Sequence, residues 1–418
     1  MFENLDRRKI ILVTLLIIGL GVLGWLVYLS VKPEITPPVN VNNINTNTGT
    51  GFPPITNGNG NFGGINLPPP GNENTNTSQP SFPEADVIAS GGPTATPVLT
   101  DGPVVNPTGT DGGAAVFYDP RDGKFYEVSP DGTRKQLSDN AYPAAEHITW
   151  APGQGKAILE FPDGANIVYD LKSQKQFTLP KEMTEFSFSP DGGKIAGKYM
   201  AEQVADRWLV TINPDGSALT GVEPMGENAD KVNVEWSGNN QVVALSRTGQ
   251  AQGLFNQQVL LVGFQGENFK GLNIEGRGFD PRWTPDGQKL LYSVYSDATN
   301  YKPTLYLVDA STDRVGANKQ ALGLQTWAEK CSFTQGTAYC AVPQSLPDGA
   351  GFVPELANGI PDTIWRVDLT TGASTIVAQP IGENGTALSA TNLTVSGDGR
   401  FLYFTDSSGR LRSVQVKP

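Results

Sequence analysis

The 418-residue sequence contains a single histidine, His147, and only two cysteines. A catalytic triad that uses histidine would depend on this one residue, and no Gly-x-Ser-x-Gly nucleophile elbow occurs in the chain. A zinc site built from several histidines is excluded for the same reason. We therefore expect a protein that is not an enzyme and that holds no metal or other cofactor.

Positive charge is missing from a long early segment. No lysine or arginine occurs between Lys32 and Arg121, and asparagine, threonine, glycine and proline dominate residues 32–110. Such a composition cannot bury enough apolar surface to offset the entropy lost on ordering. The sequence predicts a disordered linker over residues 32–110.

An apolar segment without charge precedes this linker, from Ile10 to Val31. It is long enough to cross a bilayer as a helix, and the cations at residues 7–9 favour a cytoplasmic N-terminus over residues 1–9. A cleaved signal peptide is the alternative, but Leu29–Pro33 is a poor cleavage site. We expect a single-pass plasma (inner) membrane protein whose remainder lies in the periplasm or at the cell surface.

The two cysteines flank one short hairpin. Gln335 and Gly336 form its predicted two-residue turn, which places Cys331 directly opposite Cys340 at a pair without hydrogen bonds. The Cα atoms at such a position are close enough for a disulfide. We expect the Cys331–Cys340 disulfide, in keeping with an oxidising compartment; two buried thiols are the alternative.

A repeated phrase organises the rest of the chain: a strand ending in an aromatic residue, an Asp-Gly turn and a second apolar strand. The clearest copies are Phe186–Gly197, Arg282–Ser293 and Leu393–Thr405. Looser copies are Ile148–Phe161, Val234–Ser246 and Cys331–Val342. This periodicity predicts an all-β β-propeller over residues 111–418, with almost no helix after the apolar segment.

The two ends of the repeat region decide the number of blades. Ala114–Ser138 resembles the later strands of a blade and lacks an opening strand, whereas Leu393–Val416 supplies an opening strand and two more. Five complete blades lie between them. The sequence favours seven blades, with six as the alternative if both ends share one blade.

The aromatic residues before the turns carry a family resemblance. They are Trp150, Phe188, Trp236, Trp283 and Phe333. With the turns and strands that follow them, they resemble the blades of TolB-like (WD-repeat-like) propellers and those of prolyl oligopeptidase-type propeller domains. The resemblance implies the blade type and no particular activity, because these blades occur in scaffolds and enzymes alike.

The Asp-Gly turns and the repeated aromatics have structural explanations. Asp191, Asp286 and Asp398 can accept hydrogen bonds within their turns. Calcium binding is the alternative, but the spaced carboxylates of a calcium loop are missing. We expect the aromatics to form the core between blades; platforms for sugars are the alternative.

Charged residues cluster where the opening strands begin, on the propeller face that also carries the long loops. They are Glu146, His147, Glu185, Asp230, Lys231, Arg282, Glu329 and Lys330. The longest loop covers Pro343–Asp362. Loops on a rigid scaffold are a common place for recognition, so we expect this face to bind a partner. Solvated loop charges are the alternative interpretation.

These observations favour a non-catalytic protein-binding or scaffold module of the cell envelope with an envelope protein as its partner. The alternative is a hydrolase or lyase that uses carboxylates in the channel to act on envelope polysaccharide. A sensor that signals through the apolar segment is a third possibility. The net charge of −12 makes nucleic acid an improbable ligand.

Overall fold

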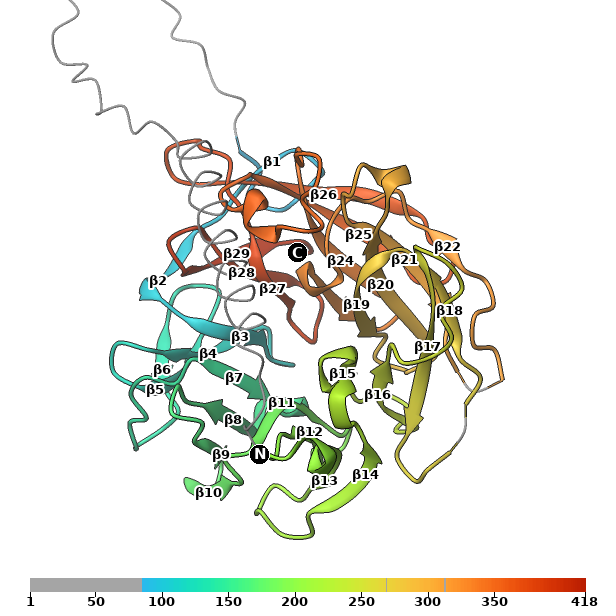
Figure 1. Ribbon diagram of the computed structural model, residues 1–418. Coiled ribbons are helices and arrows are strands. Elements are labelled where there is room, and N and C mark those ends of the chain that lie inside the picture. Colours follow the sequence, from blue (N-terminus) through green and yellow to red (C-terminus); the bar gives the residue numbers. More distant parts are fainter. Residues whose placement is uncertain (1–84, 268, 312) are drawn as a thin grey trace, which may run out of the picture. The chain divides into compact units, whose positions relative to one another are not determined.

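Seven β-sheets form a ring around a central channel in the computed structural model, which describes residues 85–418 except residues 268 and 312 (Figure 1). The predicted membrane segment 10–31 and linker residues 32–84 lie outside the described residues. Within those residues, no helix has the length and apolarity needed to cross a bilayer. The helices described there are short 3-10 turns, as the sequence predicted for the propeller.

Each blade is built on an antiparallel sheet of four strands, counted here outward from the channel, and one blade has a fifth strand. Blade 1 contains β3 (Val105–Gly109), β4 (Ala115–Asp119), β5 (Lys124–Val128) and β6 (Arg134–Gln136). Blade 2 contains β7 (His147–Trp150), β8 (Lys156–Glu160), β9 (Asn166–Asp170) and β10 (Lys175–Leu179). Blade 3 contains β11 (Met183–Phe188), β12 (Ile195–Tyr199), β13 (Trp208–Ile212) and β14 (Thr220–Pro224). Blade 4 contains β15 (Val232–Val234), β16 (Val242–Ser246), β17 (Asn256–Gly263) and β18 (Leu272–Glu275).

The remaining blades follow in the same order around the ring. Blade 5 contains β19 (Arg277–Trp283), β20 (Lys289–Tyr295), β21 (Thr304–Asp309) and β22 (Gln320–Ala321). Blade 6 contains β23 (Cys331–Thr334), β24 (Thr337–Pro343), β25 (Asp362–Asp368) and β26 (Ser374–Ile381). Blade 7 contains β27 (Thr391–Val395), β28 (Phe401–Thr405) and β29 (Arg410–Gln415). The prediction of seven blades is confirmed.

The segment before blade 1 closes the ring. β2 (Val98–Pro103) pairs antiparallel with β29 and gives blade 7 its fourth strand. β1 (Pro93–Ala95) pairs parallel with β26 and adds a fifth strand to blade 6. Two blade edges that would otherwise be open are thereby covered by residues far away in the sequence.

This closure corrects the boundary between linker and propeller. Residues 93–109, which composition assigned to the linker, form β1, β2 and β3. Blade 1 is therefore complete, because β3 supplies the opening strand that Ala114–Ser138 lacks. Burial explains the error: Val104, Pro107 and Gly109 are buried in the closed ring although their segment carries few apolar residues.

Packing between blades explains which strands are most apolar. All five residues of β4 and of β16 are buried, since the second strand of a blade is covered on both faces by its neighbours. All three residues of β6, the outermost strand of blade 1, are exposed. Trp236 and Trp283 are each only 6% exposed and belong to cores shared by adjacent blades, as expected for the repeated aromatics.

The turns and the disulfide agree with the sequence-based expectations. Asp191 accepts hydrogen bonds from the Ser189 hydroxyl (2.6 Å) and the Gly193 amide (2.9 Å), and Gly192 has φ of 65°. Cys331 and Cys340 are register partners, and a disulfide joins them with their Cα atoms 4.1 Å apart.

Candidate functional site

The two faces of the ring differ in what they expose. The Asp-Gly turns that join the first and second strands of a blade lie on one face. The connections between second and third strands, and those from one blade to the next, lie on the other, which we call the loop face. The longest connection there is the β24–β25 loop, residues 344–361, which contains the short 3-10 helix η7 (Pro354–Ala357).

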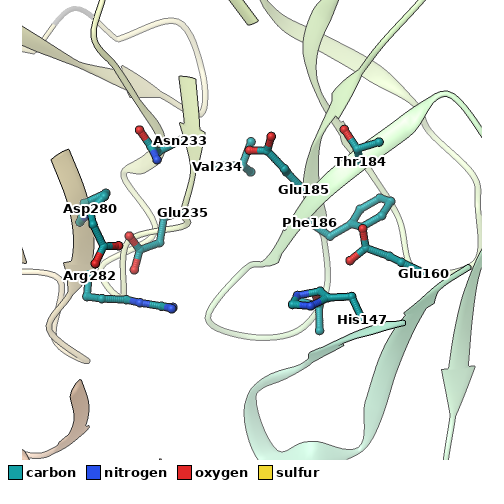
Figure 2. A pocket seen from close by; sticks show the side chains of 12 residues that line it. His147, Glu160, Thr184, Glu185, Phe186, Asn233, Val234, Glu235, Asp280 and Arg282 are labelled. Carbon is teal, nitrogen blue, oxygen red and sulfur yellow. The ribbon is translucent and has the colours of Figure 1, made fainter. Parts of the chain in front are cut away.

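A cavity of about 370 Å³ lies inside the channel and is lined by blades 2 to 5. We call it the acidic cavity. Four carboxylates line it: Glu160, Glu185, Glu235 and Asp280. His147, Asn233 and Arg282 also contribute to its wall (Figure 2).

A second cavity, of about 780 Å³, opens beside the first at the loop face. We call it the mouth cavity. Its wall includes Glu329 and Lys330, polar residues of blade 7, and residues 354, 355 and 357–359 of the β24–β25 loop. His147 and Arg282 line both cavities, so the two are adjacent along the channel.

Hydrogen bonds between neighbouring inner strands hold the channel wall together. The Trp283 amide donates to Glu235 Oε1 (3.0 Å), and the Glu329 amide donates to Asp280 Oδ2 (2.9 Å). Four further bonds of this kind are Ile148 N to Asn106 Oδ1, Trp236 N to Ser187 Oγ, Val395 N to Ser332 Oγ, and Gly109 N to Thr394 Oγ1. Glu235 and Asp280 thus each use one oxygen to join two blades.

A bulge in β11 directs one carboxylate into the channel. Glu185 has φ of 53°, and the pairing of β11 with β12 shifts register between Thr184 and Ser187. Bulges of this kind redirect a side chain at the cost of local pairing. The Glu185 carboxylate lies 2.6 Å from the ammonium of Lys198, a side chain that is only 5% exposed.

The carboxyl groups of the acidic cavity are difficult to ionise. Burial raises the pKa of Glu160 to about 7, with a smaller contribution from the nearby Glu185 carboxylate. Burial also raises the pKa of Glu235 to about 7, although the Arg282 guanidinium opposes the shift. A large share of the two groups is therefore protonated at neutral pH.

The neutral form is also favoured for other ionisable groups near the acidic cavity. Burial raises the pKa of Asp280 and of Glu329, and the Asp280 carboxylate raises that of Glu329 further. Burial in the channel wall lowers the pKa of His147, and the positive charge of Arg282 lowers it further, so the imidazole is largely neutral at pH 7. Glu160 and Glu235 are thus the two channel groups that can exchange protons near neutrality.

Five of the eight residues predicted for the partner-binding face line the two cavities. His147, Glu185 and Arg282 line the acidic cavity, and Glu329 and Lys330 line the mouth cavity. Lys330 also forms an ion pair of 2.7 Å with the buried Asp362.

The other three predicted residues, Glu146, Asp230 and Lys231, are exposed and line neither cavity. The Lys231 ammonium donates to Asn228 Oδ1 over 2.9 Å. The Asp230 carbonyl oxygen accepts a hydrogen bond of 2.7 Å from Arg247.

Sequence reasoning missed Glu160, Asn233, Glu235 and Asp280. They lie within or at the ends of strands, whereas the prediction considered charges where opening strands begin. A signal was present for Asp280, which precedes Arg282 by two residues and therefore faces the same side of β19. Glu160 is the last residue of β8, the second strand of blade 2. Its contact with the channel follows only from the geometry of the sheet.

Exposed apolar side chains stand at the edge of the mouth cavity. Phe352, Val353 and Leu356, on the β24–β25 loop, are 52%, 45% and 46% exposed. We call these three residues the apolar rim. Pro354 and Glu355, which lie between them in the sequence, line the mouth cavity itself.

The loop that carries the apolar rim is held firmly. The ring of Phe352 packs against those of Tyr295 and Tyr301, at centroid distances of 4.7 and 4.8 Å. The Gly351 amide donates to the Tyr301 carbonyl oxygen (2.7 Å). Leu346 and Ala350 of the loop also form a small core with Trp327, which lies in the connection between β22 and β23. The apolar rim is therefore a preformed surface.

No protein-family model matches the sequence, and no curated protein matches it either. Solved structures do resemble it. Oligogalacturonate lyase from Vibrio parahaemolyticus has a TM-score of 0.51 at 10% identity, with 77% of this chain and 93% of that chain covered. The β-propeller domain of Cps50 (Swd1) from Myceliophteria thermophila has a TM-score of 0.50 at 11% identity, covering 77% and 100%.

The tricorn protease is a further neighbour, with a TM-score of 0.47 at 11% identity. The match covers 75% of this chain but only 33% of the protease, so this chain spans about a third of its length. These likenesses concern the fold alone. This chain is a seven-bladed β-propeller.

Proposed function

We propose that this protein is a membrane-tethered, extracytoplasmic propeller of the TolB-like type whose loop face binds an envelope protein without catalysing a reaction. The proposal places residues 10–31 in the membrane with the N-terminus in the cytoplasm. The Cys331–Cys340 disulfide is in keeping with an oxidising compartment outside the cytoplasm.

The apolar rim is the observation that carries this proposal. Three large apolar side chains are exposed next to one another on a loop fixed by aromatic contacts and by a small core. Exposing them to water is unfavourable unless a partner covers them. A rigid loop also loses little entropy on binding, which favours recognition of a protein surface.

A hydrolase or lyase acting on envelope polysaccharide is the second candidate. It is favoured by the pKa of about 7 of Glu160 and of Glu235, which suits a general acid or base inside a channel. Glu235, however, also has a structural task as the acceptor for Trp283. If this candidate is correct, Glu160→Gln will abolish product formation from envelope polysaccharide while the protein remains folded.

The protein-binding proposal predicts that charges on the apolar rim abolish partner capture. The paired substitutions Val353→Asp and Leu356→Asp should weaken binding by about 2 kcal/mol or more, roughly thirtyfold in Kd, if the rim is central to the interface. Cross-linking pull-downs from intact cells, with the linker alone as background, measure the capture. The melting temperature should change little, because both side chains are half exposed.

Leu219→Asp provides the matched control. Leu219 is 46% exposed, like Leu356, but lies in the β13–β14 connection on the opposite face. Its substitution should leave capture unchanged. Equal capture by the rim variant and the wild type would refute the proposed binding face.

A further inference from the structure

The charge of the acidic cavity is unbalanced. Its wall carries four carboxylates and one guanidinium, Arg282, and the Glu185 carboxylate is already paired with Lys198. Glu160, Glu235 and Asp280 remain. Burial raises the pKa of Glu160 and Glu235 to about 7, and a cation bound beside them would favour their ionised forms.

Two buried acceptors in this cavity also lack a donor. Glu160 Oε1 and Asn233 Oδ1 are shielded from solvent and have no hydrogen-bond partner among the described residues. They come from blades 2 and 4 and lie on different walls of the cavity (Figure 2). An unsatisfied buried acceptor destabilises the folded protein, so a ligand that donates to both acceptors would remove this cost.

The chemistry of the cavity wall indicates which kind of hydrogen-bond donor the cavity would bind. In the part of the chain that the structure describes, no three His, Cys, Asp or Glu side chains are grouped closely enough to hold a metal ion. Acceptors spread over several walls instead suit an organic cation, whose several N–H groups point in different directions. An anion would meet one guanidinium and three unpaired carboxyl groups, which disfavours it.

We infer that the acidic cavity receives a lysine or arginine side chain of the partner, which enters through the mouth cavity while the apolar rim binds neighbouring apolar residues. This inference rests on the proposed function. The two cavities share His147 and Arg282 in their walls, and Pro354 and Glu355 of the mouth cavity lie between the apolar-rim residues Val353 and Leu356 in the sequence. Glu160 Oε1 and Asn233 Oδ1 accept hydrogen bonds from the incoming cation, and the charges of Glu235 and Asp280 stabilise it.

The single histidine of the chain makes occupancy measurable. His147 lines the acidic cavity, so in the full-length protein labelled at histidine one ring signal reports on this site by NMR. The probe is n-butylammonium, which has the chemistry of a lysine side chain; n-butanol and butyrate are its neutral and anionic controls. We expect butylammonium to shift the His147 signal saturably and the two controls to leave it unchanged.

Two variants test the charges. Glu160→Gln and Asp280→Asn keep an oxygen acceptor but remove a carboxylate, and each should weaken butylammonium binding about tenfold, as expected for the loss of about 1.4 kcal/mol. Asp215→Asn removes an exposed carboxylate of the β13–β14 turn on the opposite face and should have no effect. No saturable shift, an equal shift with butyrate, or unchanged binding in both cavity variants would overturn the inference.

Partner capture separates this inference from the proposed function. If the Val353→Asp and Leu356→Asp substitutions abolish capture but Glu160→Gln and Asp280→Asn do not, the loop face binds a partner. The proposal that a cationic side chain of the partner enters the acidic cavity is then refuted. If capture persists in the rim variant as well, the proposed function itself is refuted.

Discussion

A chain shortened to begin at Asp111 will not form a closed propeller and will lose cooperative unfolding. It lacks β1, β2 and β3, so blade 1 has no inner strand and β29 has no outer partner. The core that Val104 shares with Phe117 and Leu411 is opened as well. Exposed strand edges of this kind pair with other chains, and we expect the shortened protein to aggregate.

Calorimetry and near-ultraviolet circular dichroism test this expectation. The matched control is a chain that begins at Ala85, where the described residues begin, and it should unfold in one cooperative transition. If the chain that begins at Asp111 unfolds as cooperatively and at the same temperature, the strands before residue 111 do not close the ring.

Replacing Arg412 with methionine will lower the free energy of unfolding by about 3–5 kcal/mol, because the buried Asp406 carboxylate then keeps only the longer ion pair with the more exposed Arg410. The Arg412 side chain is 3% exposed, and its Nε lies 2.7 Å from Oδ2 of Asp406, which is 4% exposed. Its Nη1 donates to the Thr96 carbonyl oxygen over 2.7 Å. This one guanidinium thus ties blade 7 to the segment just before β2.

Denaturant unfolding measures this loss, and Arg410→Met is the matched control. Arg410 lies two residues earlier on β29 and also faces Asp406, but it is 40% exposed and 3.4 Å away. An exposed pair of this kind contributes about 1 kcal/mol or less. Adding Asp406→Asn to Arg412→Met should restore part of the stability. Equal losses for Arg410→Met and Arg412→Met would show that the buried pair has no special role.

The blades could be predicted because each carries its own local signal. An Asp-Gly turn between two apolar strands specifies a hairpin without reference to the rest of the chain, and the cysteine pairing followed from counting residues around one turn. The closing strands have no such signal. β3 contains Pro107 and Gly109, and β2 contains Asp101 and Gly102. Their pairing is set by distant blades, and composition alone suggested a linker.

The site could be predicted only in part, for a related reason. Charges where opening strands begin point to the channel mouth, and His147, the first residue of β7, was found in this way. Arg282 was predicted on the same ground and does line the channel, but it is the next-to-last residue of β19. The acidic cavity, by contrast, depends on side chains from four blades that meet only when the ring is closed. Glu160 shows this most clearly, because its buried environment comes from the ring and its sequence neighbourhood resembles any other strand end.

Photo-cross-linking from the apolar rim tests the central claim most directly. A photoreactive residue at position 356 of the full-length protein is irradiated in intact cells, with the same residue at position 219 as the control on the opposite face. The account predicts one discrete covalent adduct with an envelope protein from position 356 and none from position 219. No adduct from position 356, or the same adduct from both positions, would contradict it.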